Sequence, residues 1–293
     1  MAKKTALILS GGGAKGAFQV GAEKYAREVK GYHWDIIAGV SVGALNGAML
    51  AMQKVARLWE IWNTISDEKV YTGGLNVGSA IKLLFGAKSF YGNQPLYKLL
   101  KKELEVDKIT TDLLIGSVSL VSGEYVRFNK QSPHLAEAIL ASTVMPMIWT
   151  PVDIDSNYLS MVDGGVRNVS PVGDVLDADP DEIVVINCGA EAADPLAGPP
   201  KDIVRIGLRT LDILLNELFV SDMREFIRTN DLVKQAAAHG LTLIGSHGQP
   251  LKYFDCKIIE PVAPLGDTLD FSQAAVQSSL SAGEERAHQV LGK

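Results

Sequence analysis

The sequence predicts an α/β protein with a mostly parallel central sheet and helices on both of its faces, a three-layer arrangement. Short apolar runs typical of buried strands alternate with longer segments of helical periodicity along the chain. Glycine-framed turns follow the first two of these runs and lead into the next helices. With 293 residues, 47% of them hydrophobic, the chain can build a large core, and we expect one domain over residues 1–293.

The apolar runs place the strands. Ala6–Leu9 and Ile183–Ile186 are uncharged runs of the length and character expected of strands buried on both faces. Ser122-Gly123 separates two neighbouring runs and predicts a turn between their strands. In chain order, the predicted strands span 5–10, 35–40, 112–120, 124–129, 149–154, 157–162, 182–188 and 254–260.

Helical spacing of apolar residues places the helices. After residue 202 the pattern is the longest, with a stripe from Ile203 to Leu218 that we expect to face the core and a break near Val220-Ser221. A short amphipathic core, Ala80–Phe85, interrupts the polar stretch 73–93, and a loop rich in Pro, Ala and Gly spans 189–200. The predicted helices span 15–29, 42–53, 54–66, 95–104, 134–142, 202–239 and 272–291.

Composition and charge exclude several classes of protein. The formal net charge of −6 argues against nucleic-acid binding and against a polybasic attraction to anionic lipid. Cys188 and Cys256 have no C-x-x-C spacing, so we expect reduced thiols and neither a disulfide framework nor a metal site. The uncharged stretch 36–53 is long enough to suggest a membrane span, but Ser41, Asn46 and three glycines argue against one. The apolar run after Lys4 is too short for a signal peptide, so we expect a cytoplasmic protein.

Two glycine-framed turns near the start of the chain suggest catalytic chemistry. Gly11-Gly12-Gly13-Ala14-Lys15-Gly16 follows the first predicted strand and would line up backbone N–H groups at the start of a helix, where negative charge is stabilised. Gly39-Val40-Ser41-Val42-Gly43 follows the second strand and would expose the Ser41 hydroxyl at a sharp turn. The pair predicts a nucleophile next to an anion cradle, two of the three parts of an acyl hydrolase.

The third part is a base, and Asp163-Gly164-Gly165 supplies a candidate. The three residues follow the strand-like stretch 158–162, so the carboxylate would lie at a strand end, where catalytic groups of open α/β sheets collect.

These motifs together resemble those of the patatin-like phospholipases. That family pairs a glycine-rich oxyanion loop with a G-x-S-x-G turn and a D-G-G or D-G-A element, and all three occur here in family order. Ala141–Pro146 resembles the family's A-S-x-x-x-P segment, and Asn168 and Pro171 follow the aspartate much as in many members. Lys15 stands where many members carry arginine. The resemblance covers roughly residues 5–190, and a helical extension would begin at about 200.

The resemblance implies a lipid acyl hydrolase with a Ser–Asp dyad, here Ser41 and Asp163, which needs no metal and no cofactor. The backbone N–H groups of the loop Gly11, Gly12, Gly13 and Ala14 would stabilise the oxyanion. Lys15, Gly16, Gly39, Gly43, Gly164 and Gly165 would support these motifs. A lipid or acyl ester would be the substrate, with transient contact to a membrane surface through apolar residues near 83–91 and 145–149. The oligomeric state, headgroup and chain length stay open.

Two alternative functions are compatible with some of the same residues. Ser41, Asp163 and either His239 or His247 stand in the chain order of an α/β-hydrolase triad, although several strands precede the nucleophile in that fold. The first loop also fits a dinucleotide fingerprint, but Asp35 precedes its strand instead of closing it, and no phosphate-binding G-x-x-x-x-G-K-[ST] loop is present.

Overall fold

A seven-stranded sheet forms the centre of the structure, a computed structural model that describes residues 3–70, 72–73, 91–191, 193, 195–196, 198–246 and 248–292. The main path of strands is β6-β5-β2-β1-β8-β9, and β7 pairs with β5 away from this path. Strands β5, β2, β1, β8 and β9 are parallel, whereas β6 and β7 run antiparallel to β5. The strands span Thr5–Leu9 (β1), Ile36–Gly39 (β2), Asp112–Ser119 (β5), Tyr125–Asn129 (β6), Met161–Asp163 (β7), Glu182–Ile186 (β8) and Asp255–Ile259 (β9).

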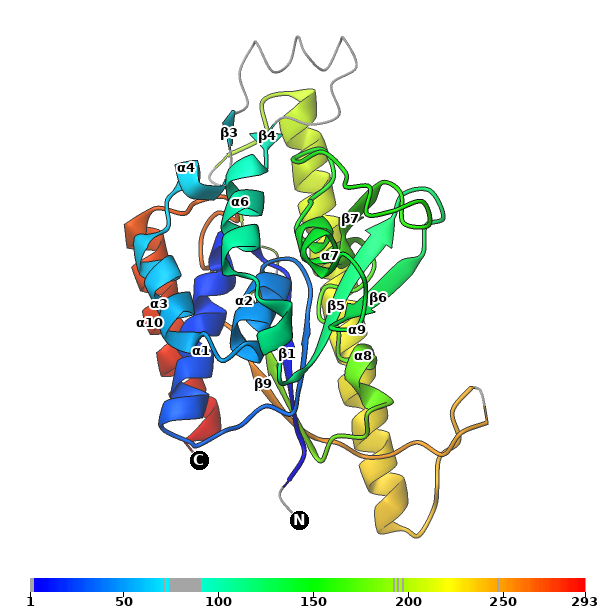
Figure 1. Cartoon of the computed structure of the whole chain (residues 1–293). Helices are drawn as coiled ribbons and strands as arrows, with labels where there is room; N and C mark the ends of the chain where they lie inside the picture. Colours follow the sequence, from blue (N-terminus) through cyan, green and yellow to red (C-terminus); the bar gives the residue numbers. More distant parts are fainter. Residues whose placement is uncertain are drawn as a thin grey trace.

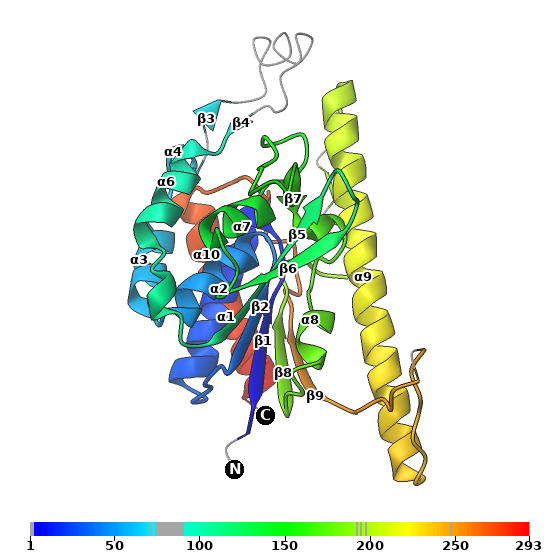
Figure 2. The same ribbon diagram turned by 45° about the vertical axis from the view of Figure 1, so that its right-hand side comes forward.

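Helices cover both faces of this sheet, as Figure 2 shows, and the predicted fold class is confirmed. On one face lie α1 (Gly16–Glu28), α2 (Val42–Ala51), α3 (Val55–Thr64), α6 (Gln94–Glu103), α7 (Leu135–Ser142) and α10 (Gln273–Leu291). On the other face lie α8 (Gly173–Leu176) and α9 (Ile203–Ala238). Smaller elements are α4 (Asp67–Val70), η1 (Gly13–Lys15), η2 (Val106–Lys108), η3 (Gly164–Val166) and a separate pair of strands, β3 (Thr72–Gly73) and β4 (Tyr91–Gly92).

Alternation of side chains along β1 explains the two layers of core. Leu7 and Leu9 face the larger cluster under α1, α2 and α10, whereas Ala6 and Ile8 face the smaller one under α8 and α9. Successive residues of a strand point to opposite faces, so a strand buried on both sides must be apolar throughout. All five residues of β1 are buried, which places this first strand at the centre of the molecule.

Two predictions about the middle of the chain were wrong. Residues 149–154 form no strand; Trp149 and Val152 are isolated bridge residues, and Val152 pairs with Met161. Helix α9 continues without a break through Val220-Ser221 (Figure 1), since Val220 packs on the sheet and the Ser221 hydroxyl donates to Glu217 one turn earlier. The predicted amphipathic core Ala80–Phe85 lies outside the described residues.

The predicted core stripe on α9 also needs correction. Ile203, Ile206 and Leu214 are 80%, 47% and 61% exposed, so the first half of the helix is not a core element. The helix reaches the core through Phe219, Val220 and Met223 instead. Within the described residues, no helix combines the length and the apolar character needed to cross a membrane.

Candidate active site

The two glycine-framed turns meet at the carboxyl ends of neighbouring strands. Leu9 ends β1 and pairs with Gly39, which ends β2, so the two chains turn away from the sheet at the same level. Gly43 in the first turn of α2 lies directly over the end of β1, since a Cβ there would be 2.2 Å from the Leu9 carbonyl oxygen. This close approach requires a residue without a side chain, and it brings Ser41 to the glycine loop.

Ser41 occupies the sharp turn between β2 and α2. Its backbone has φ 59° and ψ −127°, a conformation that strains an ordinary residue by about 1–3 kcal/mol. The Ser41 N–H donates to the Ser142 hydroxyl at 2.9 Å, and the side chain of Ser142 is fully buried. This hydrogen bond from α7 helps to hold the strained turn, so that the hydroxyl of Ser41 is presented in a fixed direction.

Asp163 reaches the same place from the opposite direction. It ends β7, which is antiparallel to β5, and pairs there with Ser117, so the carboxylate lies at a strand end as we expected. Its N–H donates to the Val144 carbonyl at 2.8 Å, and its carboxylate accepts the Gly165 N–H at 2.8 Å. The Ser41 side chain lies close enough to this carboxylate to stabilise its charged form. The structure therefore brings the predicted nucleophile and base together.

Burial changes the acidity of Asp163. The side chain is 7% exposed, and the loss of solvation raises the pKa of its carboxyl group to about 6. Hydrogen bonds from Ser41 and the Gly165 N–H stabilise the carboxylate and limit this rise. A carboxyl group with this pKa is largely ionised at pH 7, and it is a stronger base than an ordinary aspartate.

The N–H groups of the glycine loop are not all available to a ligand. Gly11 N–H donates to the Val169 carbonyl at 3.0 Å, and Ala14 N–H donates to the Thr268 carbonyl at 2.8 Å. Gly12 and Gly13 have no acceptor for their N–H groups within the part of the chain that the structure describes. The expected set of oxyanion donors, Gly11 to Ala14, is thus narrowed to Gly12 and Gly13, because tertiary contacts occupy the other two.

These groups share one pocket with an empty volume of about 920 Å³, part of it open to solvent. Ser41, Asp163 and the loop Gly11–Gly13 form its polar end, together with Lys15 and Gly165. The other walls are mostly apolar and come from the segment after α7, from η3 and the chain after it, from α9 and from the chain before α10: Met145, Pro146, Trp149, Val166, Val169, Leu215, Phe219 and Leu269. Gly16, Gly39, Gly43 and Gly164 do not line the pocket but shape the turns around it.

Histidine is absent from the described lining of this pocket. His239 follows the end of α9, about 30 Å along the helix axis from Phe219, which does line the pocket. His247 lies outside the described residues. The Asp35 carboxylate accepts a hydrogen bond from the Thr5 N–H at the start of β1. This end of β1 is remote from the glycine loop, so Asp35 cannot bind the ribose of a dinucleotide held by that loop. No group of three or more potential metal ligands occurs among the described residues.

A family model described as patatin-like phospholipase matches residues 7–176, more than half of the chain. The protein belongs to the patatin-like phospholipase family. Membership makes it a lipid hydrolase by class, and its substrate a lipid ester.

Two solved structures resemble this patatin-like chain. VipD from Legionella pneumophila is 13% identical, with a TM-score of 0.49, over 100% of this chain and 67% of VipD. The ExoU–SpcU complex of the Pseudomonas aeruginosa type III secretion system contains a chain that is 17% identical, with a TM-score of 0.30, over 76% of this chain and 52% of the other. Both likenesses are remote.

Sequence reasoning missed several residues around the patatin-like site. Ser142 lies within the A-S-x-x-x-P segment, so the motif itself could have indicated its contact with the nucleophile turn. Thr268 and Cys188 come from parts of the chain without a family motif, and nothing local connects them with the glycine loop. Cys188 is buried, and this burial raises the pKa of its thiol to about 12, so it is an unreactive wall of the pocket.

Packing against Cys188 leads to a testable prediction for Gly12. A Cβ on Gly12 would lie 2.3 Å from the Cys188 Cβ. Gly12→Ala should therefore lower the thermal midpoint by several degrees, and Cys188→Gly in the same chain should recover part of this loss, because it removes the obstructing atoms but not the strain of a side chain at a φ of 158°. Thermal unfolding of the two single variants and the double variant measures the coupling. Strictly additive midpoints would contradict the contact.

Proposed function

We propose that this patatin-like protein hydrolyses lipid acyl esters through a Ser41–Asp163 dyad, with the N–H groups of Gly12 and Gly13 as the oxyanion hole. One observation carries the proposal: Ser41, a buried carboxylate that its side chain stabilises, and two N–H groups of the described loop that have no acceptor all line one pocket. Such a site holds the nucleophile, the base and the anion stabiliser that acyl transfer needs.

The reaction would run in two steps. Ser41 Oγ attacks the ester carbonyl carbon while its proton passes to Asp163, and the oxygen of the tetrahedral intermediate accepts hydrogen bonds from Gly12 and Gly13. The intermediate collapses, and the leaving alcohol takes the proton from Asp163. A water molecule, deprotonated by Asp163, then attacks the acyl-enzyme, and Asp163 returns this proton to Ser41 Oγ as the fatty acid leaves. The raised pKa of Asp163 suits both proton transfers near neutral pH.

Covalent labelling tests the proposal most directly. A fluorophosphonate probe should label the protein, and peptide mapping should place the label on Ser41, because only an activated serine reacts quickly with such a probe. Ser41→Ala should remain unlabelled. NAD or ATP should leave the labelling rate unchanged. Saturable nucleotide binding that slows labelling would favour the dinucleotide-binding alternative, and loss of labelling in a folded His239→Ala or His247→Ala variant would favour the triad.

The rim of the pocket supports a further part of the proposal, transient contact with a membrane surface. The first half of α9 supplies Leu215 and Phe219 to the pocket wall and carries exposed apolar residues, among them Ile206 and Leu214. Met147, next to two pocket residues in sequence, is 44% exposed. Exposed apolar side chains around a lipid site favour an interface with lipid, and the net charge of −6 favours a zwitterionic one.

Vesicle flotation can test this contact. Leu214→Glu should reduce the fraction of protein that floats with phosphatidylcholine vesicles several-fold, because the change places a charge on the apolar rim. Leu232→Glu is the matched control, since Leu232 is 48% exposed but lies in the second half of the same helix, beyond the pocket. Equal flotation of the two variants would count against a membrane-facing rim on α9.

A further inference from the structure

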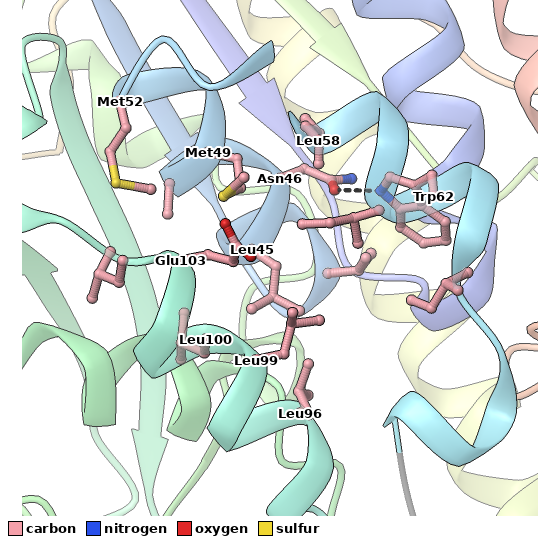
Figure 3. Close-up of a pocket in the computed structure, with 15 residues that line it drawn as sticks. Leu45, Asn46, Met49, Met52, Leu58, Trp62, Leu96, Leu99, Leu100 and Glu103 are labelled. Atoms are coloured by element: carbon pink, nitrogen blue, oxygen red, sulfur yellow. Dashed lines mark hydrogen bonds between the residues drawn. The ribbon is translucent and has the colours of Figure 1, made fainter. Parts of the chain in front are cut away.

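A second pocket lies between α2, α3 and α6, and its described lining shares no residue with the Ser41 pocket. Figure 3 shows side chains from the three helices directed toward a common space, with Leu45 and Met49 from α2, Leu58 from α3 and Leu99 from α6. Its empty volume is about 570 Å³, part of it open to solvent. This pocket has no part in the dyad chemistry described above.

The walls of this pocket offer almost nothing to a polar ligand. Asn46 and Glu103 are polar members of the lining, together with the Trp62 indole N–H, and each already has a partner. Asn46 donates to Gly16 and Gln19 at 3.1 and 2.9 Å and accepts from Trp62 at 2.9 Å (Figure 3). Glu103 accepts from Arg57 at 2.7 Å. An occupant must therefore be apolar and recognised by its shape.

One lining residue of this pocket directly follows the nucleophile in the sequence. Val42, the residue after Ser41, lines one end, and Met52, just after α2, lines the other. These ten residues of helix rise about 15 Å, so the pocket follows α2 away from the active site. Val42 also touches the end of the glycine loop, since a Cβ on Gly16 would lie 2.3 Å from a Val42 methyl carbon.

The composition of the lining fits an unbranched hydrocarbon chain. Leucine and methionine side chains from α2, α3 and α6 make up most of the walls. Methionine is unbranched and adapts its conformation to irregular contents, and Met49 and Met52 both face this space. A flexible apolar chain would displace water from these walls without leaving a buried polar group unpaired.

We propose that the pocket between α2, α3 and α6 binds the fatty acyl chain that Ser41 releases from the lipid substrate. This inference rests on the proposed function, because it assigns a place to one part of the substrate of that site. It also predicts selectivity: chains long enough to pass Val42 and extend beside α2 gain contacts that short chains lack.

Filling the pocket from its rim tests the assignment. Leu99 is half-buried on α6 and lines the pocket, whereas Lys98 on the same helix is exposed and does not. Leu99→Trp should lower kcat/KM for a nitrophenyl hexadecanoate at least tenfold and leave that for the butanoate within twofold. Lys98→Trp, the matched control, should change neither. If Leu99→Trp fails to fold, Leu99→Phe makes the same test with a smaller ring.

A binding measurement tests whether the pocket holds an acyl chain independently of ester hydrolysis. The fluorescent fatty acid cis-parinaric acid should bind Ser41→Ala, and Leu99→Trp in that background should raise its Kd at least tenfold. If Leu99→Trp leaves the dependence of kcat/KM on chain length unchanged, the assignment is wrong. This holds even if Leu99→Trp weakens binding of cis-parinaric acid, because the pocket would then hold free fatty acid and not the acyl chain of the substrate. A wild type that cleaves neither ester would contradict the proposed function, whereas the binding arm would still report on the pocket.

Discussion

Replacing Ser41 with alanine should reduce ester hydrolysis by about four to six orders of magnitude, because the attacking oxygen itself is lost. The thermal midpoint should stay within a few degrees of that of the wild type, since the backbone hydrogen bond to Ser142 remains. The pKa of Asp163 should rise further, because the hydroxyl of Ser41 lowers it. Activity above a few per cent of wild type in a folded variant would contradict the assignment.

A second substitution at Ser41 separates the chemistry from the strain. Ser41→Gly should be as inactive as Ser41→Ala, but more stable than it by about 1 kcal/mol, because glycine adopts a φ of 59° without steric cost. Chemical denaturation of the two variants measures the difference. Equal stability would show that the turn between β2 and α2 holds no strain at this residue.

Replacing Asp163 with asparagine should also reduce turnover by several orders of magnitude, since the amide keeps the shape of the carboxylate but accepts no proton. In the wild type, kcat/KM should rise with pH and level off above an apparent pKa of about 6, because only the ionised carboxylate is a base. The small residual rate of Asp163→Asn should lack this rise. A wild-type profile that levels off at pH 4 would contradict an elevated pKa.

Although Asp163→Asn should reduce turnover, it should increase the stability of the folded protein at high pH. The pKa of Asp163 is higher in the folded protein than its ordinary value of 3.8, so the wild type loses stability as pH increases from about 4 through 6. Asparagine has no charge to desolvate, so Asp163→Asn should be more stable than the wild type at pH 8, by up to about 3 kcal/mol, and no more stable at pH 4. Denaturation at the two pH values tests the sign of this difference.

Much of the fold could be predicted because local pattern and final environment agree. β1 and β2 are apolar throughout and lie buried on both faces, so their sequence and surroundings give the same answer. The prediction was wrong for the first half of α9. Its spacing is that of a buried stripe, yet Ile203 and Leu214 are exposed, and helical periodicity alone does not say whether a core or a ligand covers an apolar face.

The candidate site was predictable in its residue types but not in its hydrogen bonds. Ser41 and Asp163 follow from turn motifs, because a sharp turn after a strand has strict glycine requirements that are visible in sequence. The choice among the loop N–H groups depends on Val169 and Thr268, which lie more than 150 residues further along the chain. Such contacts exist only in the folded molecule, so the sequence could not indicate which of the four loop N–H groups already have an acceptor.

The central place of β1 has a consequence for how the protein is made. β1 leaves the ribosome before its neighbours in the sheet and can pair with β2 almost at once, but its other edge waits for β8, which begins at Glu182. At ordinary rates of synthesis this interval is on the order of ten seconds. Throughout it, a largely apolar strand has an open edge, and for most of it Ser41 lacks the Asp163 that arrives with β7. The nascent chain is therefore vulnerable to aggregation until β8 has emerged.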